Sequence, residues 1–137
     1  IEPFMQDLLS TMPMERVQVT GAVSAEALPD IYRKADIFCL PSLEEGLPLV
    51  LLQAMASGLP IVATPETGAE DIITDGKEGR IFPANNHKAL HETLEAMVSD
   101  AKERRIMGQA ARAKVKDSYS WNNYVERAMT TYQALVG

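Results

Sequence analysis

Residues 36–65 read DIFCLPSLEEGLPLVLLQAMASGLPIVATP, and they decide the fold of the chain. Two short apolar runs, at 37–40 and 61–63, are each followed closely by a proline. Strands buried on both faces of a parallel sheet show this continuous apolar pattern, so we expect a strand at each run. The stretch therefore predicts a strand, a polar loop, a helix and a second strand, in that order.

The helix between the two strands is expected to begin at Pro48 and to end at Gly58. Proline suits the first turn because its missing N–H would have no intrahelical partner there, and glycine is the usual residue just past a helix end. Residues 49–56 are apolar except for Gln53, so we expect this helix to pack against protein on most sides.

The loop ahead of this helix carries Ser42, Glu44, Glu45 and Gly46. Backbone amides of this loop and of the first helical turn would point out of the helix N-terminus, where they have no intrahelical acceptor. Such amides, together with the helix dipole, bind anions. The loop therefore predicts a site for phosphate or another anion.

The rest of the chain alternates strand and helix patterns and then becomes helical. The fold class predicted is α/β, a Rossmann-like parallel sheet flanked by helices, with a C-terminal helical tail. Right-handed crossovers would bring the loops after Val19, Leu40 and Ala63 to the carboxyl edge of the sheet, where ligands of such sheets bind. Further helices are expected at 3–12, 28–35, 70–74 and from Asn86 onward, with Ser120 capping the last one, and further strands at 17–20 and 80–83.

Length and composition restrict the function. A chain of 137 residues forms one domain by the usual size range, and its net charge of −6 argues against nucleic acid as a partner. The single Cys39 falls in an expected buried strand, so no internal disulfide forms and a cytoplasmic setting is expected. His87 and His91 have a spacing that can hold zinc, but no further Cys or His joins them, so we expect no metal. No apolar run is long enough to span a membrane, and the chain does not begin with Met, which is compatible with a fragment.

Several motifs together resemble the C-terminal, nucleotide-sugar-binding domain of retaining glycosyltransferases of family 4, which have the GT-B fold. The similarity extends from Val17 to the C-terminus and includes the segment 119–121, which is like the one that opens the family's last helix. The residues that carry it are Gly21, Val23, Leu28, Pro29, Ile31, Tyr32, Ala35, Asp36, Pro41, Ser42, Glu45, Gly46, Pro48, Gln53, Gly58, Pro60, Thr64, Gly68, Asp71, Asp75, Gly76 and Gly79.

The resemblance implies binding of a nucleoside diphosphate sugar without a cofactor. Glu45, the expected catalytic residue, would contact the hydroxyls of the donor sugar and orient it. Amides around Gly46 and Leu47 would hold the diphosphate, and Gln53 falls at the position that contacts the ribose. The loop of residues 20–23 would lie near the base. The expected donor-site residues are Gly21, Val23, Glu45, Gly46, Leu47, Pro48, Leu49, Gln53 and Gly68.

The chain departs from the family pattern in two respects. The family has glutamate at the position of Gln53; an amide keeps one acceptor oxygen but lacks the charge, so it would weaken ribose binding without abolishing it. The family's Arg and Lys pair, which neutralises the diphosphate, has no counterpart before Val17, and no acceptor-binding domain is present. We therefore expect residues 1–137 to be a single truncated donor-binding domain that is inactive alone.

Alternatives remain for these residues and for the function. Glu45 is otherwise a solvated loop acid, Gln53 a core amide, and Trp121 a packing anchor for the last helix. The basic residues of the tail, at 104–116, are a solvated face or a peripheral contact with the membrane. The acceptor would be a glycan or lipid, in polysaccharide or glycolipid synthesis. Rival functions are a sugar-nucleotide epimerase or phosphorylase of the same architecture, and a non-catalytic domain that binds nucleotides or partner proteins.

Overall fold

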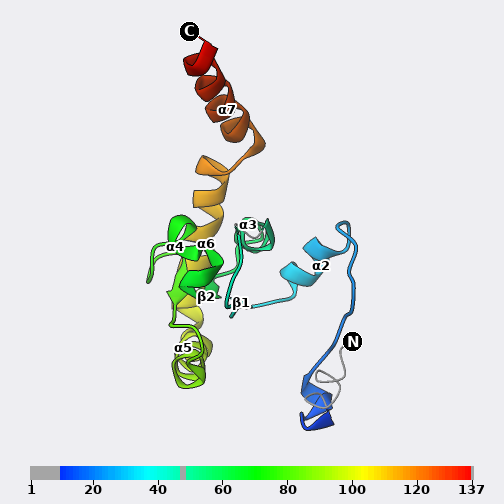
Figure 1. The fold of residues 1–137 in the computed structure, drawn as a ribbon. Coiled ribbons are helices and arrows are strands. Elements are labelled where there is room, and N and C mark those ends of the chain that lie inside the picture. Colours follow the sequence, from blue (N-terminus) through cyan, green and yellow to red (C-terminus); the bar gives the residue numbers. More distant parts are fainter. Residues whose placement is uncertain (1–9, 47–48, 137) are drawn as a thin grey trace.

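A parallel sheet lies at the centre of the protein (Figure 1). The computed structural model describes residues 10–46 and 49–136, and in them the strands follow the order β1–β2–β3. Both strand pairs are parallel, so the α/β class and the Rossmann-like arrangement are confirmed. The strands are β1 Phe38–Leu40, β2 Ile61–Ala63 and β3 Gly79–Ile81. The helices are α2 Leu28–Arg33, α3 Leu49–Ala56, α4 Ala69–Ile72, α5 His87–Ser99, α6 Ala101–Ser118 and α7 Trp121–Val136, with short 3-10 helices η1 Met14–Arg16 and η2 Pro65–Thr67.

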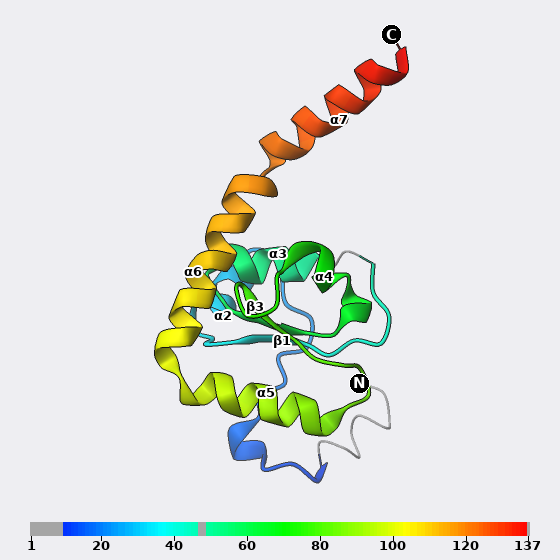
Figure 2. The ribbon, with the colours of Figure 1, turned by 90° about the vertical axis from the view of Figure 1, so that its left-hand side faces the viewer.

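The sheet separates two apolar layers, with α3 and α4 on one face and α5 on the other (Figure 2). Successive side chains of a strand point to opposite faces. Accordingly, Ile61 and Ala63 of β2 join the layer with α3 and α4, while Val62 joins the layer with α5. Helix α6 contributes Met107 to one layer and Ala111 to the other. Strand β2 is buried on both faces, as its apolar run predicts.

The helix boundaries follow the expected end signals. Gly58, the second residue after α3, has φ 83°, and its N–H donates to the carbonyl of Met55 at 2.9 Å, which confirms the expected stop. The Asn86 side chain accepts from the N–H of Ala89 at 2.9 Å, and the Ser120 hydroxyl accepts from the N–H of Asn123 at 3.2 Å, so both expected caps are confirmed.

Some local expectations are wrong. Residues 17–20 form no strand: the described chain brings no neighbouring strand to them, and Val19 is 47% exposed. Strand β1 is the edge of the sheet in the described chain, so Cys39 is exposed and not buried. Helix α3 is not covered on most sides, since Leu49 is 69% exposed. The helix expected at 3–12 falls outside the described residues except for its last three positions.

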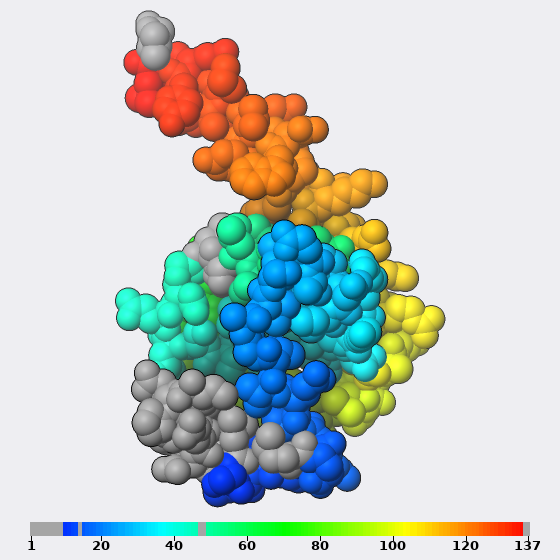
Figure 3. Space-filling model, turned by 90° about the vertical axis from the view of Figure 1, so that its right-hand side faces the viewer, coloured from blue at the N-terminus to red at the C-terminus, as the bar shows by residue number. Residues whose placement is uncertain are grey.

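Helix α7 projects away from the sheet beyond the end of α6 (Figures 1 and 3). Its side chain Trp121 is 79% exposed and meets Tyr124 edge to face, with ring centroids 5.9 Å apart. Trp121 is therefore not a buried anchor within the described chain. None of the described helices combines the length and apolarity that crossing a membrane requires.

Candidate functional site

Two loops meet at the carboxyl edge of the sheet. The loop after β1 covers residues 41–46, and the segment after β2 covers residues 64–68 and includes η2. The backbone N–H of Glu45 donates to the carbonyl of Glu66 at 3.0 Å, which joins the two loops directly. The loops after Leu40 and Ala63 therefore meet, as the topology predicts.

Gly68 adopts a backbone conformation that favours glycine where the two loops meet. It lies between η2 and α4 with φ 68° and ψ 14°, a left-handed conformation that glycine adopts without steric cost. A Cβ atom at this position would lie 3.4 Å from the carbonyl oxygen of Gly46. Because 3.4 Å is an ordinary contact distance, it is the left-handed φ, and not a lack of space, that favours glycine at position 68.

The Glu45 side chain is exposed and has a hydrogen-bond donor within its own loop. The Ser42 hydroxyl donates to Glu45 Oε1 at 3.3 Å. The carbonyl of the same Ser42 accepts from the Thr64 hydroxyl at 2.5 Å. Sequence reasoning missed this role of Thr64; the available signal was a hydroxyl residue directly after a buried strand.

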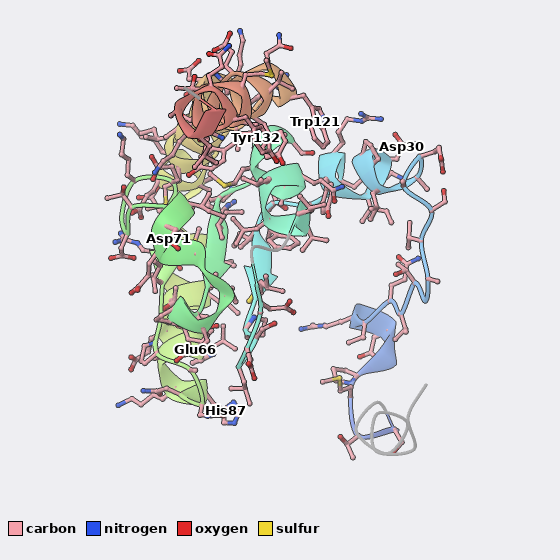
Figure 4. All side chains as sticks on the ribbon, turned by 45° about the horizontal axis from the view of Figure 1, so that its top comes forward. Asp30, Glu66, Asp71, His87, Trp121 and Tyr132 are labelled. Atoms are coloured by element: carbon pink, nitrogen blue, oxygen red, sulfur yellow. The ribbon has the colours of Figure 1, made fainter. Side chains whose placement is uncertain are left out.

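The two loops and α4 are strongly acidic. Residues 41–46 and 64–72 contain no lysine or arginine. Figure 4 shows Glu66 and Asp71 on the segment that follows β2, with His87 at the start of α5. A diphosphate at this edge would therefore need backbone amides, the α3 dipole or cations from elsewhere. The acidic side chains of these segments are Glu44, Glu45, Glu66, Glu70 and Asp71.

Gln53 opens onto a groove between α3 and the start of α7. Its side chain is exposed, so the core-amide interpretation is wrong. The groove has a volume of about 610 Å³ and is largely apolar. The residues that line it are Leu49, Leu52, Gln53, Ala56, Tyr119, Ser120, Trp121, Tyr124 and Arg127.

Gly21 and Val23 are not assembled with Glu45, and two further expected donor-site residues are not described. Leu47 and Pro48 lie outside the described residues. The segment that carries Gly21 and Val23 lies apart from the two loops, on the outer side of α2 (Figure 1). The structure thus brings together Glu45, Gly46 and Gly68, with the first residue of α3 following in the chain.

Side chains outside these loops show no sign of metal binding or reactive chemistry in the described ranges. No group of His, Cys, Asp and Glu there could hold a metal ion, and His91 faces Glu95 at 3.7 Å. Partial desolvation raises the pKa of the Cys39 thiol, which lowers its thiolate fraction at neutral pH. In the basic tail, Arg104 donates to the carbonyls of Met97 and Val98, both at 2.6 Å, so this guanidinium is used within the fold.

A protein-family comparison matches most of the chain. The family model described as "Glycosyl transferases group 1" matches residues 5–114. Among curated proteins, Sulfoquinovosyl transferase SQD2 of Arabidopsis thaliana is 34% identical over 132 residues, covering 94% of this chain and 25% of that protein.

Solved structures resemble the whole chain in fold. Sucrose-phosphate synthase (tll1590) from Thermosynechococcus elongatus superposes with a TM-score of 0.88 at 24% identity, covering 96% of this chain and 33% of that one. Anabaena Alr3699/HepE in complex with UDP-glucose superposes with a TM-score of 0.86 at 18% identity, covering 96% of this chain and 36% of that one. The chain thus spans a quarter to about a third of the length of these three proteins.

Proposed function

Because the chain belongs to the family of glycosyl transferases group 1, we propose that it is the donor-binding part of a retaining transferase. The transferase moves a sugar from a nucleoside diphosphate sugar to an acceptor. The parallel sheet flanked by helices is the arrangement of a GT-B C-terminal domain. The complex of HepE with UDP-glucose, a protein of the same fold, supports this class of donor.

The observation that carries the proposal is the contact between the two loops at the carboxyl edge. The hydrogen bond from the N–H of Glu45 to the carbonyl of Glu66 and the approach of Gly68 to Gly46 assemble one site from two segments. This edge is where ligands of doubly wound sheets bind. The site also lies ahead of α3, whose N-terminus favours negative charge.

Each part of the site then has a role in transfer. The Glu45 carboxylate accepts hydrogen bonds from the sugar hydroxyls and orients the anomeric carbon. The amides of the loop at Gly46 and the N-terminus of α3 stabilise the charge that develops on the departing diphosphate. Gln53 lies one turn beyond the first residue of α3 and is exposed. Its side-chain amide contacts the ribose.

Calorimetric titration with UDP, GDP and ADP, and with the corresponding sugar nucleotides, tests this proposal. Glu45→Ala should weaken the sugar-bearing ligand more than the bare diphosphate, because only the former offers sugar hydroxyls. Glu44→Ala is the matched control, with the same charge change in the same exposed loop. Equal losses for both ligands in Glu45→Ala would contradict the role of the carboxylate, and the absence of binding by every nucleotide would contradict the proposal itself.

Gln53→Glu tests the ribose contact separately. Hydrogen bonds to a charged acceptor contribute about 1.5–3 kcal/mol against about 1 kcal/mol for neutral ones, so the variant should bind nucleotides several-fold more tightly. Unchanged or weaker binding would remove Gln53 from the site. It would favour the second candidate function, a non-catalytic domain that binds a nucleotide or a partner protein, for which the replacement of the family's glutamate by Gln53 is the supporting observation.

Transfer itself would need more than these residues. The relatives are several times longer, and the acceptor, a glycan or a lipid at the membrane surface, would be bound by segments outside residues 1–137. We therefore expect little or no transfer by the 137-residue chain alone in an assay with a labelled donor sugar. Robust turnover by that chain would refute this expectation.

A further inference from the structure

Thr64 stands where a threonine normally caps a helix, but its hydroxyl serves another segment. It occupies the N-cap position of η2 with extended φ −94° and ψ 155°, and its side chain makes no capping hydrogen bond. A capping threonine would accept from the backbone N–H two or three residues later. Here the hydroxyl donates to the carbonyl of Ser42, 22 residues earlier in the chain, at 2.5 Å.

The orientation of Thr64 is determined by its own neighbours. Its side chain is only 1% exposed, directly after the fully buried strand β2. Its carbonyl accepts from the hydroxyl of Thr67 at 2.6 Å and from the N–H of Thr67 at 3.2 Å. Thr67 is itself 0% exposed. Two buried threonines, Thr64 and Thr67, are therefore hydrogen-bonded at the start of the loop.

Ser42 links Thr64 to Glu45 through two hydrogen bonds. Its carbonyl accepts from Thr64, and its hydroxyl donates to Glu45 Oε1 at 3.3 Å. The backbone N–H of Glu45 is held in turn by the carbonyl of Glu66. An exposed glutamate side chain without such partners samples many rotamers, and ordering it on binding would cost free energy.

We propose that Thr64 and Ser42 are positioning residues that hold the Glu45 carboxylate in the orientation needed to bind the donor sugar. The inference rests on the proposed function, since Glu45 must contact the sugar for its orientation to matter. It differs from a purely structural role in one measurable respect. A structural staple would support the whole loop and affect every nucleotide ligand, whereas a positioning role affects only the sugar-bearing one.

The test uses Thr64→Val, which keeps the shape and removes the hydroxyl, and Thr64→Ser, which keeps the hydroxyl. The tightest-binding diphosphate from the titration above and its sugar conjugate are the probes. Thr64→Val should weaken binding of the sugar conjugate about fivefold relative to the bare diphosphate, the loss expected for one neutral hydrogen bond, because the Thr64 hydroxyl donates to the carbonyl of Ser42. Thr64→Ser should restore the preference for the sugar conjugate over the bare diphosphate. The double variant Glu45→Ala/Thr64→Val should lose no more of this preference than Glu45→Ala alone.

Ser42→Ala gives a second route if Thr64→Val does not fold. It removes only the donor to Glu45 Oε1 from a partly exposed loop, and the same selective loss is expected. Equal weakening of both ligands, or no change, in a folded variant would overturn the positioning role. If Glu45→Ala selectively weakens binding of the sugar conjugate but Ser42→Ala does not, this inference is refuted and the proposed function stays intact. Equal weakening of both ligands in Glu45→Ala itself, or no binding by any nucleotide, would refute both.

Discussion

Replacing Gly108 by alanine tests how closely α6 crosses the end of α3. A Cβ atom built at Gly108 lies 2.0 Å from the carbonyl oxygen of Gly58 and 3.0 Å from its carbonyl carbon, well inside the 3.4 Å at which ordinary contact begins. Both close atoms belong to the backbone, so no side chain can rotate away. The helices must separate for alanine to fit.

The sign of the effect depends on two opposing terms. Alanine stabilises a helix interior by about 1 kcal/mol relative to glycine. Overpacking costs about 1–3 kcal/mol, and the upper part of that range applies because the clash is with backbone. We therefore expect Gly108→Ala to lower the free energy of unfolding by about 1–2 kcal/mol, although alanine is the better helix former.

Urea and thermal unfolding of the chain, followed by circular dichroism, provide the assay. The unfolding midpoint should fall by about 4–8 °C, at roughly 4 °C for each kcal/mol. Gln109→Ala, on the exposed face of the same helix, is the control and should change stability by no more than about 0.5 kcal/mol. A Gly108→Ala variant at least as stable as the parent would refute the close crossing of α3 and α6.

Leu51→Ala should destabilise the chain by about 3 kcal/mol, because Leu51 is 0% exposed. Leu49→Ala, at a position 69% exposed, should cost less than about 0.5 kcal/mol in the same unfolding assay. Similar costs for the two variants would contradict the one-sided burial of α3. Glu78→Ala removes a carboxylate that is 1% exposed and accepts from the N–H of Thr74 at 2.7 Å, so it should cost about 2 kcal/mol, and a neutral result would argue against that buried bond. Desolvation disfavours the Cys39 thiolate and raises the pKa of the thiol. The pH midpoint of the rate of Cys39 alkylation should therefore be higher in the folded chain than in urea. An equal or lower midpoint in the folded chain would contradict the raised pKa.

The centre of the fold could be predicted from sequence because its signals are local. The apolar run at 61–63 is buried on both faces in the structure, and Gly58 ends α3 as expected. The meeting of the loops after Leu40 and Ala63 followed from the rule that parallel strands share a carboxyl edge. None of these three predictions needed knowledge of contacts between residues far apart in the sequence.

The errors arose where the outcome depends on what lies alongside. The run at 37–40 has the same apolar pattern as 61–63, but β1 has a strand on only one side in the described chain, which leaves Cys39 exposed. Residues 17–20 alternate as a strand would, yet a strand needs a partner to form a ladder. The hydrogen bond from Thr64 to Ser42 spans 22 residues, so the local signal, a hydroxyl residue directly after a buried strand, does not identify its partner.

In the proposed function, the loops after β1 and β2 together hold a nucleoside diphosphate sugar. Backbone amide chemical shifts of the isotope-labelled chain, recorded during titration with UDP-, GDP- and ADP-sugars, test it most directly. One of these ligands should shift the amides of Glu45, Gly46 and Gly68 most strongly, and Ser42→Ala should reduce the shifts caused by the sugar. Shifts confined to α5 or α7, or no shift with any of the ligands, would contradict it.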